Sequence, residues 1–205
     1  MWLCLSEPDT STSDFSRVVL SKSHVNSLMG SSLNAHNKDN HQKLNSTVTP
    51  KFQDIIKSPS MLFAFGFGSG LSKWAPGTVG TLAAVPFYWL MSDFPLFLFL
   101  GVVLVASILG VWICQAASDA MAVHDHPGIV WDEFVGYWIT MIAAPSGWFW
   151  IVFGFVMFRI FDILKPWPIS WLDRRVSGGL GIMIDDILAG IFAFAVVQIA
   201  AAYWG

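Results

Sequence analysis

The run of residues 94–117 constrains this chain more than any other stretch. Its 24 residues include no Asp, Glu, Lys, Arg or His. At 1.5 Å of rise per residue, a helix over this run is about 36 Å long, which exceeds the roughly 30 Å hydrocarbon thickness of a bilayer. Hydrophobic residues make up 55 % of the chain and charged residues 12 %, a more apolar balance than soluble domains have. The sequence therefore predicts an integral membrane protein in which residues 94–117 form a transmembrane helix.

Three further apolar segments cover residues 79–91, 134–158 and 187–204. The first is short for a membrane span, and the last has 18 residues. The segment 134–158 contains Pro145 and Gly147, so it is either one kinked helix or two half-spans. Together with residues 94–117, these segments predict an all-α, polytopic bundle of about four apolar segments.

A glycine-rich break precedes these segments. Residues 66–70 contain three glycines, and Lys73 and the Ala-Pro-Gly-Thr sequence at 75–78 follow. Irregular backbone at membrane depth is tolerated only where protein or a wet cavity surrounds it, so the break predicts a re-entrant or interfacial loop. Backbone amides around Ser69, Gly77 and Thr78, together with Lys73, are suited to holding a phosphate. A plain glycine-rich turn between two helices is the alternative.

Residues 1–58 differ in composition from the rest of the chain. They are rich in Ser, Asn, His and Lys and have no long apolar run or sustained periodicity. Such segments bury too little apolar surface to offset the entropy lost on folding. The sequence predicts a disordered polar tail over 1–58 and a membrane-embedded domain over 59–205.

Charge and cysteine content exclude several kinds of site. The formal net charge is −3 and there is no basic run, so the sequence predicts no nucleic-acid partner. Cys4 and Cys114 are the two cysteines, too few for a thiolate metal cluster. We interpret Cys114, within an apolar helix, as a small buried hydrophobic residue.

Charged side chains in residues 59–205 are few and clustered. Nine are acidic and five are basic. Ionisable groups near hydrocarbon are costly, so they are candidates for function. Asp132 and Glu133 immediately precede the apolar segment 134–158. A helix dipole explains one carboxylate at such a position but explains two less well.

The densest charge lies between residues 159 and 186. Arg159, Asp162 and Lys165 are spaced three residues apart, which places them along one face of a helix. Pro166 disfavours helix at Lys165 and is expected to end that element.

A second group of charges follows this predicted helix. Arg174 and Arg175 come next, and a predicted glycine turn at 178–181 then delivers Asp185 and Asp186 to the start of the last helix. Carboxylates bind a hard cation such as magnesium, whereas arginine and lysine bind phosphate. The two sets together indicate phosphoryl chemistry.

Four motifs occur in order along the chain. They are PGTVGT at 76–81, IVWDEFVG at 129–136, FRIFDILKPWPI at 158–169 and DRRVSGGLGIMIDD at 173–186. They closely resemble the bacterial phosphatidylglycerophosphatase A family, and the resemblance covers about residues 59–205. It implies a magnesium-dependent, multi-pass phosphatase of the bacterial inner membrane that converts phosphatidylglycerophosphate to phosphatidylglycerol and inorganic phosphate. It also implies that the active site faces the cytoplasm.

With this resemblance, the charged residues receive hypothetical roles. Catalysis and the binding of one or two Mg²⁺ ions are assigned to carboxylates: Asp132, Glu133, Asp162, Asp185 and Asp186. Substrate binding is assigned to residues that can hold phosphate oxygens: Lys73, Thr78, Arg159, Lys165 and Arg174. A remaining carboxylate acts either as general base for water or as a covalent phospho-acceptor, and the sequence leaves both routes open.

Other function classes fit less well. A cation transporter also places carboxylates near apolar helices and broken segments. It has no need of three or four cations beside its acids, and residues 59–205 show no inverted repeat. The chain also lacks the Cys-x5-Arg loop of cysteine phosphatases and the DGxxAR signature of the CDP-alcohol phosphotransferases. The expected partners are a membrane lipid substrate and the bilayer itself, and the sequence makes no prediction of a protein partner.

Overall fold

The computed structural model describes residues 50, 52–123 and 126–204, which lie within one compact unit at 45–205. Every regular element in these residues is a helix, and none of them forms a strand. The elements are α2 (Phe52–Ile55), α3 (Pro59–Ala64), the 3₁₀ helix η1 (Gly66–Leu71), α4 (Pro76–Met91), α5 (Leu96–Met121), α6 (Trp131–Thr140), α7 (Trp148–Leu164), α8 (Ile169–Asp173) and α9 (Gly178–Trp204). The predicted all-α class is confirmed for the described part of the chain.

Two of the described helices, α5 and α9, are long and apolar enough to cross a bilayer. They contain 26 and 27 residues, about 39 and 40 Å of helix. The exposed side of α5 is apolar, with Leu104, Ile108 and Trp112 more than half exposed. This pair of helices is consistent with a membrane protein.

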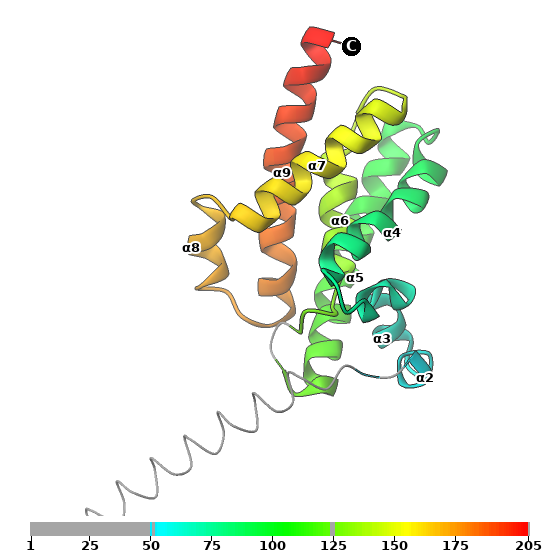
Figure 1. Cartoon of the computed structure of the whole chain (residues 1–205), viewed down its shortest axis with the longest axis vertical. Helices are drawn as coiled ribbons and strands as arrows, with labels where there is room; N and C mark the ends of the chain where they lie inside the picture. Colours follow the sequence, from blue (N-terminus) through cyan, green and yellow to red (C-terminus); the bar gives the residue numbers. More distant parts are fainter. Residues whose placement is uncertain (1–49, 51, 124–125, 205) are drawn as a thin grey trace, which may run out of the picture. The chain divides into compact units, whose positions relative to one another are not determined.

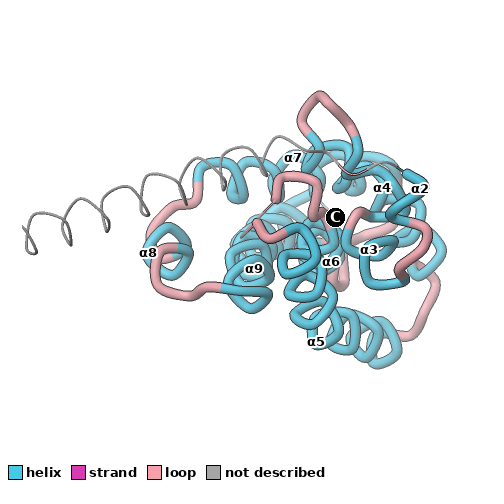
Figure 2. The backbone as a smooth tube through the Cα atoms, turned by 90° about the horizontal axis from the view of Figure 1, so that it is seen from below, coloured by secondary structure: helices cyan, strands magenta, loops and turns pink. Residues whose placement is uncertain are grey.

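Helix α9 occupies the centre of the bundle. It contacts α5, α6, α7 and α8, and the end-on view in Figure 2 shows it between α8 and α6. Figure 1 shows α7 crossing α9 obliquely, with α6 beside both helices. Side chains that α6, α7 and α9 direct inward therefore meet in one region.

The segment 134–158 contains parts of two helices. Helix α6 ends at Thr140, and α7 begins at Trp148 after Gly147, whose φ of +125° suits glycine. Of the ten residues of α6, nine are buried, and about 15 Å of helix is half of the bilayer's hydrocarbon thickness. Helix α6 is therefore an internal helix, and the segment forms two separate helices in place of one kinked helix.

The predicted glycine turn at 178–181 is wrong, because these residues form the first turn of α9. Glycine is needed there for close packing. A Cβ at Gly179 would lie 2.7 Å from the backbone nitrogen of Gln115 in α5, and the Gln115 side chain accepts a hydrogen bond from the Gly179 amide. Asp185 and Asp186 consequently lie about two turns inside α9.

The glycine-rich segment folds as a tight turn between two helices. Gly66, Phe67 and Gly68 all have positive φ values within η1, a conformation that costs energy for a residue with a Cβ such as Phe67. Pro76, Gly77 and Thr78, which the sequence predicts as part of this break, instead form the first residues of α4.

The predicted tail over 1–58 falls mostly on residues outside the described range. Within its described residues, 50 and 52–58, the stretch Phe52–Ile55 forms α2, in which Ile55 is fully buried. Cys114 is fully buried in α5, as the sequence predicts.

Candidate active site

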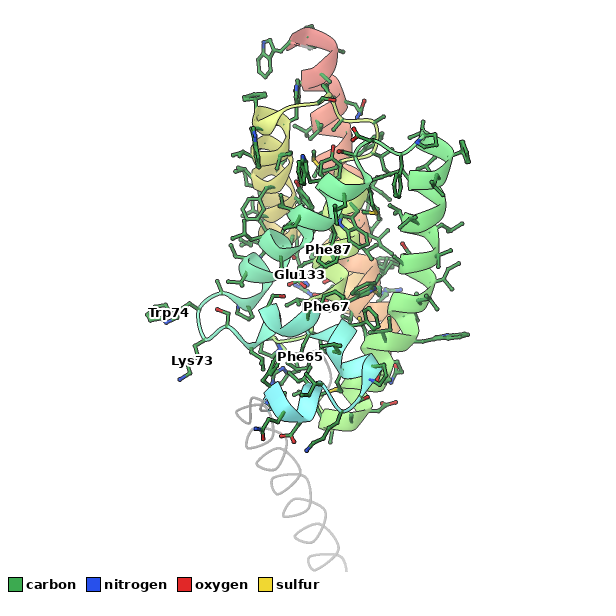
Figure 3. All side chains as sticks on the ribbon, turned by 90° about the vertical axis from the view of Figure 1, so that its right-hand side faces the viewer. Phe65, Phe67, Lys73, Trp74, Phe87 and Glu133 are labelled. Atoms are coloured by element: carbon green, nitrogen blue, oxygen red, sulfur yellow. The ribbon has the colours of Figure 1, made fainter. Side chains whose placement is uncertain are left out.

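Asp132 and Glu133 lie in the first turn of α6, inside the bundle. The backbone N–H of Val130 donates to the Ala64 carbonyl at 2.8 Å, which fixes the start of α6 against α3. Asp132 is 9 % exposed, and its carboxyl group is within hydrogen-bonding reach of that of Glu133. Figure 3 shows Glu133 in the interior of the molecule. Carboxylates removed from water are costly unless a cation or hydrogen-bond donors compensate them. A positive group is therefore expected beside the buried Asp132 and the partly buried Glu133.

Asp186 of α9 completes a group of three acids. One carboxylate oxygen from each of Asp132, Glu133 and Asp186 lies within 4.8 Å of the other two. Within the described residues, Glu133 Oε2 and Asp186 Oδ2 are buried without a hydrogen-bond partner. Carboxylates this close repel one another, and a divalent cation relieves the repulsion by binding their oxygens. We call Asp132, Glu133 and Asp186 the acid cluster.

Glycine contacts set the spacing between α6 and α9. A Cβ at Gly190 would lie 2.5 Å from the carbonyl oxygen of Gly136, so only glycine permits this approach. The Thr140 hydroxyl donates to the Gly136 carbonyl at 3.0 Å and lies 3.4 Å from the Gly190 carbonyl. Gly136 follows Asp132 by about one helical turn, and Gly190 follows Asp186 by the same interval. The backbone contact therefore lies directly beside the acid cluster.

Helix α7 contributes a cation and a fourth carboxylate. Arg159 Nη1 and Asp162 Oδ2 form an ion pair at 2.5 Å, and both side chains are 14 % exposed. The carboxyl group of Asp162 is within hydrogen-bonding reach of that of Asp186. The positive charge of Arg159 favours the negatively charged form of Glu133. The stripe predicted along one face of this helix thus places Arg159 and Asp162 against the acid cluster.

The start of α4 approaches the same region. A Cβ at Gly77 would overlap the Glu133 carboxylate and lie 3.2 Å from both terminal nitrogens of Arg159. Thr81 Oγ1 donates to the Gly77 carbonyl at 2.9 Å and accepts a hydrogen bond from Arg159 Nη1 at 3.4 Å. A helix leaves its first amides unpaired, and these favour an anion. The sequence predicts a phosphate-binding role for the backbone around Gly77 but not its close approach to Glu133 or the contact between Thr81 and Arg159. The spacing of four residues between Gly77 and Thr81 was a signal that they share a helix face.

Lys165 is held by two carboxylates. Its Nζ lies 2.5 Å from Asp185 Oδ2 and 3.4 Å from Asp173 Oδ1. Burial lowers the pKa of Lys165, but hydrogen bonds and charge from Asp185 and Asp173 outweigh burial, and the net pKa is raised. Lys165 was predicted to bind phosphate and Asp185 to bind metal; the structure places the two in contact and ties α8 to α9.

Replacing Lys165 by Met should lower the free energy of unfolding by about 2 kcal/mol, because it removes the cation from two carboxylates. Since the folded-state pKa of Lys165 is raised above 10.5, its contribution is fully present below about pH 10.5 and is lost as pH rises through the raised value. Unfolding of both proteins in detergent from pH 7 to 11 should show a constant difference that narrows only at the alkaline end. Lys73→Met, at an exposed position, is the control, and a difference that changes between pH 7 and 9 would contradict the assignment.

Two predicted phosphate ligands, Lys73 and Arg174, have exposed side chains. Lys73 is exposed in the loop before α4, and Figure 3 shows it projecting away from Glu133. Arg174 is exposed just after α8, and the neighbouring Arg175 lies 4.4 Å above the ring of Trp171. The predicted residues that the structure brings together are Asp132, Glu133, Asp162, Asp186 and Arg159, with the pair Lys165 and Asp185 adjacent to them.

The acid cluster fits a hard divalent cation in its donor chemistry. Its ligand atoms are all carboxylate oxygens, the type that Mg²⁺ prefers. The two buried oxygens that lack a hydrogen-bond partner among the described residues are atoms that such a cation would compensate. Arg159 supplies the positive group expected beside a phosphate.

Known proteins match most of the chain. The sequence profile of a family described as Phosphatidylglycerophosphatase A matches residues 62–201. A protein of that name from Escherichia coli (strain K12) is 48 % identical over 165 residues, which are 77 % of this chain and 96 % of that protein. Another of that name, from Haemophilus influenzae (strain ATCC 51907 / DSM 11121 / KW20 / Rd), is 48 % identical over 151 residues, covering 73 % and 92 %.

A third relative carries a different name. A Bacteroides thetaiotaomicron protein, provisionally named a phosphatidylinositol-3-phosphatase, is 37 % identical over 161 residues, which are 73 % of this chain and 98 % of that protein. No solved structure matches the chain. The family match runs from α3 to α9 and contains the acid cluster, Arg159 and Gly77, so the resemblance drawn from the four motifs is confirmed. The chain belongs to the phosphatidylglycerophosphatase A family.

Proposed function

We propose that the protein hydrolyses the phosphate monoester of phosphatidylglycerophosphate, giving phosphatidylglycerol and inorganic phosphate in phospholipid synthesis. The observation that carries the proposal is the acid cluster beside Arg159 in a member of this family. Phosphate monoesters are hydrolysed extremely slowly without a catalyst, so the protein must neutralise charge and position the reacting groups. The names of the E. coli and H. influenzae relatives support the choice of lipid.

The cofactor that we propose is Mg²⁺, held by the acid cluster together with Asp162. When bound, the ion supplies charge neutralisation at phosphate and activation of water. The chain brings four carboxylates to one place to hold it, from α6, α7 and α9. Asp185, paired with Lys165, borders this group and does not need to contact the ion.

Arg159 is proposed to hold the substrate phosphate. Its ion pair with Asp162 and its hydrogen bond with Thr81 fix the direction of the guanidinium group. The buried Nε of Arg159 has no hydrogen-bond partner among the described residues. The absence of a side chain at Gly77 lets the first turn of α4 approach both Arg159 and Glu133, where its amides add to phosphate binding.

For the displacement itself, we propose direct attack by water on phosphorus, with a carboxylate that does not hold the ion accepting the water proton. The bond between phosphorus and the lipid oxygen breaks as the bond to the water oxygen forms. The departing oxygen takes up the proton that the carboxylate accepted, which gives phosphatidylglycerol and inorganic phosphate. Attack by a carboxylate would instead form a phosphoaspartate. Rapid acid quench during turnover, followed by mass spectrometry, distinguishes the two routes, because only the second one leaves a phosphorylated residue.

The membrane arrangement that we propose has four apolar segments, α4, α5, α7 and α9, with the site facing the cytoplasm of a bacterial inner membrane. The internal helix α6 then lies among them. The turn η1 would enter the bilayer from the cytoplasmic side as a re-entrant segment. Exposed aromatic residues at the end of α9, Tyr203 and Trp204, suit the opposite interface.

Phosphate release tests the proposal directly. The purified protein in detergent should release phosphate from phosphatidylglycerophosphate with magnesium, and chelation should reduce the rate by at least about 100-fold. Magnesium should also raise the unfolding temperature, because a ligand that binds only the folded state stabilises it. A folded sample that binds magnesium without releasing phosphate would contradict the proposed reaction.

Phosphatidylinositol 3-phosphate is the comparison substrate, since one relative carries that name. Faster phosphate release from this lipid than from phosphatidylglycerophosphate would identify it as the better substrate. The proposal of a phosphatase activity would still hold. The cation transporter considered from the sequence is not supported by any of the three relatives, all of which are named as phosphatases.

A further inference from the structure

An apolar groove runs along α7 beside the start of α4. It has a volume of about 340 Å³ and is lined by Thr78, Phe155, Val156, Arg159, Ile160, Ile163 and Leu164. Figures 1 and 2 both show α4 and α7 as neighbours, and the two helices are in contact. Apart from Thr78 and Arg159, the lining side chains are hydrocarbon. We call this cavity the α7 groove.

The α7 groove borders the candidate active site at Thr78 and Arg159. Arg159 lines the groove and also pairs with Asp162, which is within reach of Asp186. Thr78 lines it from the first turn of α4, next to Gly77, which approaches Glu133. A phosphate held by Arg159 would therefore have an apolar groove open beside it, and a molecule with a phosphate next to long hydrocarbon chains matches both parts.

The groove has the size and exposure expected of a site for one acyl chain. The groove extends along about 14 Å of α7 from Phe155 to Leu164, with Arg159 between its two ends. Ile163 and Leu164 are 68 % and 71 % exposed, whereas Val156 and Ile160 are 42 % and 40 % exposed. The groove is thus open on its outer side, and a chain can enter from the bilayer without leaving an apolar environment.

We infer that the α7 groove binds an acyl chain of the lipid phosphomonoester and so aligns the phosphate with Arg159. This inference rests on the proposed phosphatase function and adds the place where the substrate's hydrocarbon lies. Lipid tails are as apolar as the groove, so transfer from bilayer to groove contributes little affinity. The groove acts by orientation, and a misplacement of about 1 Å can reduce turnover by about 100-fold.

Filling the groove tests this inference. Val156→Trp should lower kcat/KM for dioleoyl phosphatidylglycerophosphate in mixed micelles by about tenfold, because the indole occupies the space of the chain. Ile163→Trp provides a second variant at a more exposed position, where folding is less sensitive to size. The matched control is Val105→Trp, an exposed valine of α5 that does not line the groove.

A binding measurement separates this inference from the proposed function. A dioleoyl-type phosphatidylglycerophosphate with a diazirine in one acyl chain should crosslink to residues 155–164 of the wild-type protein, and Val156→Trp should reduce that crosslink. Crosslinking does not require turnover. Wild-type phosphate release without any crosslink to residues 155–164, or with equal activity of Val156→Trp, Ile163→Trp and Val105→Trp, would overturn the groove assignment alone. If the wild-type protein released no phosphate, the result would instead contradict the proposed phosphatase function.

Discussion

Replacing Asp186 by Asn should reduce magnesium-dependent phosphate release by at least about 1,000-fold. The change removes one charged oxygen ligand from the acid cluster, whose ligand atoms lie within 4.8 Å of one another. It should also abolish the rise in unfolding temperature that magnesium produces. Without magnesium, the variant should be at least as stable as the wild type, because a buried charge beside other carboxylates is costly. Phosphate release and thermal unfolding, each with and without magnesium, measure these effects.

The control for this variant is Asp93→Asn. Asp93 lies in the turn after α4, about 24 Å along that helix from Gly77. The Asp93→Asn variant should retain both phosphate release and the magnesium-dependent rise in unfolding temperature. If Asp186→Asn kept more than a tenth of wild-type turnover, the metal role of Asp186 would be wrong.

Replacing Arg159 by Lys should lower kcat/KM by about 100-fold, although the charge is kept. A guanidinium group can bind two phosphate oxygens and still contact Asp162 and Thr81, whereas an ammonium group is a single compact donor. Because the loss arises from geometry at phosphate, magnesium should still raise the unfolding temperature of this variant. Initial rates over a range of lipid concentrations, together with thermal unfolding, test both parts.

Arg175→Lys is the matched control. Arg175 lies over the ring of Trp171 and is exposed, so the same substitution there should change kcat/KM by less than about twofold. Equal losses at the two positions would indicate a general sensitivity to arginine replacement and would remove the argument for Arg159 as the phosphate ligand.

The acidic residues of the candidate site could be predicted from the sequence because charge is costly in an apolar chain. Asp132, Glu133 and Asp186 stand next to or within long hydrophobic runs, and the structure brings them together. The spacing of Arg159 and Asp162 was equally informative, since residues three apart share a helix face. Both signals come from residues close together in the sequence, and the packed structure places these residues as the signals predict.

Glycine and lysine positions carried less information. Glycine occurs both in the turn at Gly68, which has a positive φ, and in the helix–helix contact at Gly179. Only the segments of the protein that pack against each glycine distinguish the two uses. Lys165 lies 20 residues from Asp185 in the sequence. Their pairing depends on the residue at which α7 ends and on how α9 packs against α7. Lys73 projects away from the acid cluster for a related reason, since a loop side chain takes its direction from tertiary structure.

The contact between Gly136 and Gly190 has a consequence for selectivity among divalent ions. Mg²⁺ requires oxygen ligands at about 2.0–2.1 Å, whereas Ca²⁺ accepts about 2.3–2.6 Å and more ligands. The separation of α6 from α9 is limited by backbone touching backbone at these glycines, and both helices carry acids one turn away. Discrimination by ionic radius would then originate in residues that donate no ligand at all. A methyl group at either glycine would widen the gap between the helices and shift preference toward the larger ion, even with every carboxylate retained.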